Sequence, residues 1–214
     1  VTLGSYTRAS GNYSTAIGRD VITSGNTAVG VGTNVTASGV GSVGMGFEAN
    51  ATADTAVAIG RSITTSDSNS FGAGSNVTVS NNYAVGLGYQ ATASGANAIA
   101  IGSSGQSGTN VQATANDAIA IGTRAKATAS AGVALGRFAD AQGENAVALG
   151  NNTVATTKNS IAIGESANVE AGQGSIALGW NSKVTTEDVK YHPTAAGKTK
   201  ANPYLLNDNV DTMK

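Results

Sequence analysis

The residues best suited to acid–base or nucleophilic chemistry are few in this 214-residue sequence, and their spacing does not bring them together. There is no cysteine, and His192 is the single histidine. A serine–histidine–aspartate arrangement needs a histidine base, so it would depend on chance proximity to that one residue. Asp140 and Glu144, the nearest pair of acidic residues in the regular part of the sequence, are typical of an exposed turn. We therefore predict no catalytic residue and no enzymatic activity.

Cofactor and metal chemistry have equally little support. Residues 192–199 (HPTAAGKT) are similar to a phosphate-binding loop, but a histidine replaces the first glycine. Without that glycine and a buried strand before it, the backbone N–H groups would not surround a phosphate. The lack of cysteine excludes iron–sulfur clusters and thiolate zinc sites. Because the acidic residues do not form the aspartate ladder of calcium-binding β-rolls, we predict no cofactor and no bound metal.

The composition excludes further classes of protein. Twelve basic and thirteen acidic residues give a formal charge of −1, which excludes a broad nucleic-acid-binding surface. The chain has only one Trp, six Tyr and three Phe, but 29 Gly, so a conventional core of large side chains cannot be built. Such a chain can bury much of its surface only if small apolar residues recur regularly.

Glycines that close an apolar run recur with a period of 14 residues, apart from one interval of 20 and one of 15. They are Gly4, Gly18, Gly32, Gly46, Gly60, Gly74, Gly88, Gly102, Gly122, Gly136, Gly150, Gly164 and Gly179. A period kept over this length is the mark of a repeat architecture. A unit this short has room for two strands of about five residues and two turns.

The residues around each repeat glycine alternate with a period of two, which indicates strands. Before Gly32, the large residues Val29 and Val31 alternate with small ones; after it, Val35 and Ala37 alternate with polar ones. The sequence therefore predicts an all-β fold, a parallel β-roll or two-strand β-solenoid of 14-residue coils. About 13 coils would fill residues 1–180, with a loop insertion near 103–110. Residues 181–214 do not repeat and could be a cap, an insertion or a neck-like transition.

The first strand of each coil is apolar on both faces, so one apolar face should remain exposed on a single chain. We expect this face to be the column of small residues, and a continuous apolar stripe of this kind marks an interface between identical chains. The predicted interface stripe comprises Ala28, Gly30, Ala56, Ala58, Ala98, Ala100, Ala118, Ala120, Ala146 and Ala148. The residues themselves do not determine how many identical chains share this interface.

Three of the units carry a resemblance to a known family. Asn97–Gly102, Asn145–Gly150 and Asn159–Gly164 read N-[AS]-[VI]-A-[LI]-G, and x-x-Ala-x-Ala follows other repeat glycines, such as Gly122 and Gly136. They resemble the YadA-like head of trimeric autotransporter adhesins, over roughly residues 1–180. The resemblance implies a left-handed roll, a homotrimer, and a location on the bacterial outer membrane, facing outward, with membrane contact only through an anchor outside these residues. It also implies a non-enzymatic virulence adhesin that binds host matrix proteins or cell-surface receptors and promotes autoaggregation.

Two surfaces are candidates for partner binding. The residue after each repeat glycine should point outward, and exposed arginines and aromatic residues are common in binding hot spots. We call these residues the turn column; its candidate members are Arg19, Phe47, Arg61, Tyr89, Arg137 and Trp180. The loop insertion adds Gly105, Gln106, Gly108 and Asn110.

Two alternative functions remain open at this stage. Threonine and serine recur on the outward positions of the second strand between residues 36 and 94. Such rows could order water, which would suit an ice- or surface-binding β-solenoid. The same roll could also serve as a structural spacer in a phage-type fibre.

Overall fold

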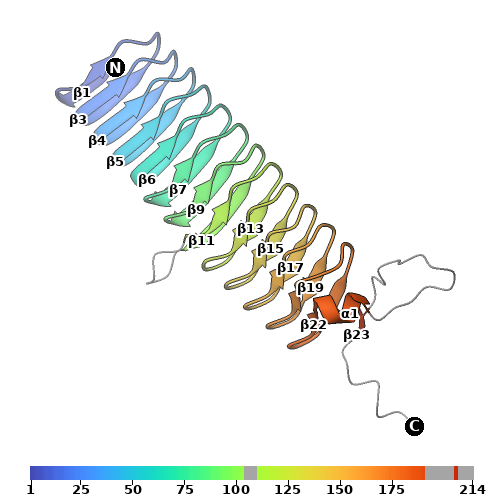
Figure 1. The fold of residues 1–214 in the computed structure, drawn as a ribbon. Helices are drawn as coiled ribbons and strands as arrows, with labels where there is room; N and C mark the ends of the chain where they lie inside the picture. The colour runs from blue at the N-terminus through green and yellow to red at the C-terminus, as the bar shows by residue number, and fades with distance from the viewer. Residues whose placement is uncertain (104–109, 191–204, 207–214) are drawn as a thin grey trace.

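The computed structural model describes residues 1–103, 110–190 and 205–206, which form a long rod of stacked β-coils (Figure 1). The N-terminus lies at one end of the rod, and the short helix α1 (Thr186–Lys190) lies at the other. All recorded strand pairings are parallel, and each joins one coil to the next. These observations confirm the predicted all-β parallel β-roll.

The strands differ in length along the rod. In four coils one nine-residue strand passes through the turn: β3 (Thr15–Thr23), β4 (Val29–Ala37), β5 (Val43–Ala51) and β6 (Val57–Thr65). In the other coils the first strand is separate: β1 (Thr2–Ser5), β7 (Phe71–Ser75), β9 (Val85–Tyr89), β11 (Ile99–Ser103), β13 (Ile119–Ile121), β15 (Val133–Leu135), β17 (Val147–Leu149), β19 (Ile161–Ile163) and β21 (Ile176–Leu178). The second strands there are two residues long: β2 (Arg8–Ala9), β8 (Thr78–Val79), β10 (Thr92–Ala93), β12 (Gln112–Ala113), β14 (Lys126–Ala127), β16 (Asp140–Ala141), β18 (Val154–Ala155), β20 (Asn168–Val169) and β22 (Lys183–Val184).

The strand register follows the sequence period. Val29 pairs with Val43, one 14-residue coil further along. Ile99 pairs with Ile119 across the 20-residue coil, and Ile161 pairs with Ile176 across the 15-residue coil. Both insertions therefore leave the stack of strands intact.

The repeat glycines are required by their backbone conformation and by close contact between coils. Gly46 has a φ of 128°, a region that residues with a side chain rarely adopt. A Cβ atom placed on Gly46 would also lie 1.9 Å from the carbonyl oxygen of Gly60 in the next coil. No other residue type meets both conditions, which explains why glycine marks the period.

The interior of the roll is narrow and is filled mainly by alanine and valine. Ala28 and Val35 are both fully buried, whereas Val29 and Val31 are only half-buried. A Cβ atom on Gly30 would lie 2.7 Å from Val21 Cγ1 in the facing layer. The two layers are thus too close for large side chains on the first strand, whose large residues must point outward.

This orientation overturns the predicted interface stripe. The prediction placed the small residues of the first strand outside and its large residues inside. In the structure Ala28, Gly30, Ala56, Ala58, Ala98, Ala100, Ala118, Ala120, Ala146 and Ala148 are all buried inside the roll of a single chain. They cannot contact a second chain, because they already form the core.

The described part of residues 181–214 closes one end of the roll. The backbone N–H and the hydroxyl of Thr185 donate to Asp188 Oδ2 at 2.6 and 2.7 Å, which caps the first turn of α1. These hydrogen bonds, first that of the N–H, lower the pKa of Asp188. Val189 of α1 packs against the core, and β23 (Leu205–Leu206) pairs with Ala177 and Leu178 of β21.

Candidate functional site

The large residues of the first strands form a continuous apolar face along the rod, which we call the aliphatic stripe. Its members are Val29, Val31, Val43, Met45, Val57, Ile59, Phe71, Ala73, Val85, Leu87, Ile99, Ile101, Ile119, Ile121, Val133, Leu135, Val147, Leu149, Ile161, Ile163, Ile176 and Leu178, of which Ala73 alone is small. Met45 and Leu135 are each 40% exposed, and Leu178 is 47% exposed. A stripe this long on a single chain is an unsatisfied apolar surface.

The turn column lies at the turn that follows the repeat glycine. All six predicted members are exposed, and of the three aromatic members Trp180 is exposed most, at 74%. Phe47 and Arg61 are direct neighbours in the register of adjacent coils. The other members are separated by smaller residues: Thr33 stands between Arg19 and Phe47, for example.

Several predicted residues fall outside the described part of the chain. Gly105, Gln106 and Gly108 of the loop insertion do so, and so do His192 and the segment 192–199. Asn110, the last loop residue, is described and half-buried. Among the described residues, no three histidine, aspartate or glutamate side chains are grouped as a metal site would need.

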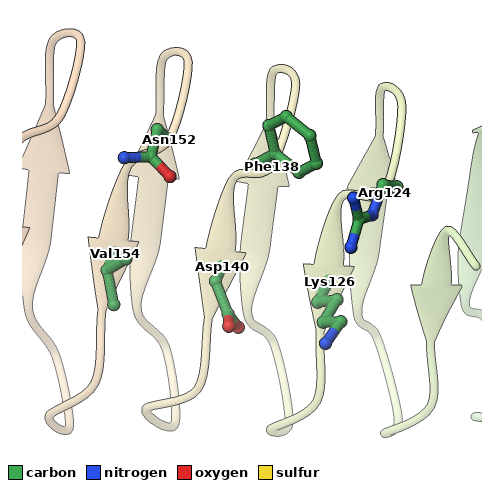
Figure 2. A pocket seen from close by; sticks show the side chains of 6 residues that line it. All are labelled: Arg124, Lys126, Phe138, Asp140, Asn152 and Val154. Atoms are coloured by element: carbon green, nitrogen blue, oxygen red, sulfur yellow. The ribbon is translucent and has the colours of Figure 1, made fainter. Parts of the chain in front are cut away.

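A hollow on the opposite face from the aliphatic stripe was not predicted. Its volume is about 190 Å³, and it is lined by Arg124, Lys126, Phe138, Asp140, Asn152 and Val154. Figure 2 shows these side chains in two rows along the rod, with Arg124, Phe138 and Asn152 above Lys126, Asp140 and Val154. Members of a row are 14 residues apart, so stacking of three coils assembles the hollow.

Two cationic side chains, Arg124 and Lys126, line this hollow, and Arg137 lies beside it on the Phe138 ring. The guanidinium carbon of Arg124 lies 4.7 Å from the centre of the Phe138 ring, and that of Arg137 lies 4.2 Å from it. Such cation–π contacts hold the two guanidinium groups in place. Across the described residues, no carboxylate lies within 4.0 Å of the charged nitrogens of Lys126 or Arg137.

Asp140 supplies the one carboxylate of the hollow. Its Oδ2 accepts a hydrogen bond of 2.9 Å from Gln142 Nε2. Its Oδ1 is shielded from solvent and has no hydrogen-bond partner. The lining of the hollow therefore contains two cationic side chains and one carboxylate, on a chain that is almost neutral overall.

The sequence contained a signal for this hollow. Arg124, Lys126, Arg137 and Asp140 place four charges within two coils of a chain in which only 12% of residues are charged. Of these four residues, only Arg137 directly follows a repeat glycine, and it lies beside the hollow instead of lining it. The lining residues occupy the second and fourth positions after three successive repeat glycines, and the charges at those positions were the signal.

Together these features define a class: a parallel β-solenoid repeat protein with one apolar face and extended binding surfaces. A family model for the YadA head domain repeat matches residues 3–20, 37–62, 80–104, 113–139, 141–167 and 171–188. These ranges cover more than half of the chain, which therefore belongs to the YadA head repeat family and is a YadA-like adhesin head.

Among solved structures, the chain is similar to the collagen-binding domain of the Yersinia adhesin YadA. The two are 27% identical, and the match covers 72% of this chain and 64% of that chain, with a TM-score of 0.32. The chain thus spans less than two thirds of the length of that domain. A comparison with curated proteins gives no match. No helix among the described residues is long and apolar enough to cross a membrane.

Proposed function

We propose that this chain is the non-enzymatic head of a trimeric adhesin on a bacterial surface, where it binds a host matrix protein or a cell-surface receptor. The observation that carries the proposal is the aliphatic stripe, because it runs from Val29 to Leu178 along the rod, opposite a polar face. One face is suited to self-association and the remaining surface is left for partners. Membership in the YadA head repeat family supports three chains about a common axis and an outward-facing location.

Self-association follows from the exposed area of the stripe. Burying its large side chains against copies of the same chain would contribute roughly 25 cal/mol per Å² of apolar surface. A rotational arrangement with each stripe facing the axis closes the interface and leaves no free apolar edge. No charged residue occupies a stripe position. The proposed interface would therefore contain no ion pair that salt could screen.

Adhesion would then depend on many weak contacts. Each chain presents its turn column in several coils, and three chains multiply those contacts, so avidity replaces a single tight site. The similar Yersinia domain is described as collagen-binding, which makes collagen the first partner to test. Contact between heads on neighbouring cells would account for autoaggregation.

The stripe is tested by the double substitution Leu135→Lys/Leu149→Lys. These side chains are neighbours in register on the exposed face, and two charges there should prevent association. Thr64→Lys/Thr78→Lys is the matched control, since these exposed neighbours lie on the polar face. Sedimentation should give a trimer for the wild type and the control, and a smaller species for the stripe variant. A monomeric wild type would contradict the proposal.

The turn column is tested by replacing Phe47, Arg61 and Tyr89 with alanine. All three are exposed, so the melting temperature should change little, because surface substitutions usually stay within about 0.5 kcal/mol. Binding to immobilised collagen should weaken about tenfold or more if the column contains hot-spot residues. Unchanged collagen binding by a trimeric, folded variant would remove the column from the proposal.

A further inference from the structure

We propose that the hollow formed by Arg124, Lys126, Phe138, Asp140, Asn152 and Val154 binds an acidic sugar residue of a host glycan. The inference rests on the proposed function only in assuming that the polar face of the rod is displayed to outside partners. It requires neither collagen binding nor the turn column.

The position of the hollow leaves it accessible in an assembled head. Lys126, Asp140 and Val154 begin β14, β16 and β18, and the next residue of each strand is a fully buried alanine. Since side chains alternate along a strand, these three point away from the core. They lie on the sheet opposite the aliphatic stripe, so association through the stripe would not cover them.

The charges of the hollow call for an anionic group. Arg124 and Lys126 are half-buried, and half-buried cations attract an anion more strongly than fully exposed ones because solvent screens them less. Phe138 holds the guanidinium group of Arg124 against its ring, so little side-chain freedom is lost when a ligand binds. A carboxylate can accept charge-assisted hydrogen bonds from both cationic side chains.

The remaining lining selects the type of anion. Asp140 would repel a densely charged polymer, but it can accept hydrogen bonds from hydroxyl groups. Asn152 can both donate and accept, while Val154 and the edge of Phe138 offer hydrocarbon surface. An anion that also carries hydroxyl groups and C–H faces fits this mixture, and an acidic sugar has all three. The volume of about 190 Å³ suits a single sugar residue.

Binding is tested by titration calorimetry of the purified chain with four probes. 3′-Sialyllactose and a hyaluronan tetrasaccharide carry a carboxylate on a sugar, lactose is the neutral counterpart, and a glutamate-rich peptide carries carboxylates without a sugar. We expect binding of at least one acidic saccharide, weaker at higher salt, and no binding of lactose. Failure of both acidic saccharides to bind, or binding of the acidic peptide in their place, would overturn the inference.

The site is tested by the double variant Arg124→Gln/Lys126→Gln. Glutamine fits the backbone at position 124, because Gln90 occupies the equivalent position with a φ of 55°. Loss of two charge-assisted hydrogen bonds should weaken saccharide binding about tenfold or more. Arg8→Gln/Lys183→Gln removes the same charge at exposed positions elsewhere and should bind like the wild type. Equal binding by both double variants would contradict the assignment.

The same variants separate this inference from the proposed function. Arg124 and Lys126 are not members of the turn column, so collagen binding should survive their replacement. A chain that binds collagen but no saccharide would refute only the inference. A chain that binds an acidic saccharide through these cations but no matrix protein would support the inference and count against the collagen proposal.

Discussion

At the scale of single residues, glycine determines where each coil ends. At these positions the backbone has a positive φ, and the next coil lies so close that there is no room for a Cβ atom. Most repeat glycines meet both conditions. Gly179 has a φ of 109°, but apart from its chain neighbours no heavy atom of the described residues lies within 4 Å of a Cβ placed on it. The protein thus contains a natural comparison between strain alone and strain with a steric clash.

Gly46→Ala should therefore be much more harmful than Gly179→Ala. Backbone strain at such a φ costs about 1–3 kcal/mol, which both variants would share. Gly46→Ala must in addition displace the backbone of the next coil, at a further cost of about 1–3 kcal/mol typical of overpacking. Thermal denaturation at one fixed protein concentration measures the difference. Equal melting temperatures for the two variants would show that the close approach between coils adds nothing to the destabilisation by Gly46→Ala.

At the scale of secondary-structure elements, the roll needs closure at the end of its core. Helix α1 supplies it, with Val189 packed against the core and Asp188 accepting hydrogen bonds from Thr185. These bonds favour the charged carboxylate, so the pKa of Asp188 is lower in the folded protein than in the unfolded chain. A depressed carboxylate pKa stabilises the folded form at pH values above the unfolded pKa of about 3.9.

Helix α1 should consequently loosen in acid before the rest of the rod. The stabilisation by Asp188 is complete above the unfolded pKa and is lost as the pH falls through the lower folded pKa. Amide hydrogen exchange of residues 186–190, measured as a function of pH after correction for intrinsic rates, should show this opening. Asp188→Asn should reduce the pH dependence. Identical pH dependence in the variant would argue against this carboxylate as the cap.

At the scale of the whole molecule, the rod has one apolar and one polar face. The polar face contains the threonine row that suggested an ice-binding function, and Thr64, Thr78 and Thr92 are aligned in adjacent coils. The row does not continue in either direction, because Asn50 precedes it and Gln112 follows it. This threonine row therefore spans only three coils. The outward position two residues later carries hydroxyl side chains in more coils, but from Ser38 to Ser94 it mixes serine with threonine and so lacks a regular threonine array.

This short array should not adsorb to ice. We expect the purified chain to show no thermal hysteresis beyond that of a control protein at equal concentration, measured by nanolitre osmometry. A clear depression of the freezing point, lost in Thr64→Lys/Thr78→Lys, would instead favour the ice-binding alternative.

The sequence by itself determined the length of each coil and how its strands pair. The spacing of glycines predicts 14-residue turns, parallel pairing and the positions of both insertions, since a backbone conformation open only to glycine must recur wherever the chain makes the same turn. It also indicated which side chains after the glycine are exposed, as the exposure of Phe47 and Tyr89 shows.

Only the tertiary structure decided which side of the first strand forms the core. The alternation places large and small residues on opposite faces of the strand, but it does not show which face points into the core. That depends on how far apart the two layers of the roll lie. At Gly30 the facing Val21 is too close for even a methyl group, so small residues fill the interior and large ones form the aliphatic stripe. The hollow likewise depends on stacking, because residues 14 apart become neighbours only when the coils are closed.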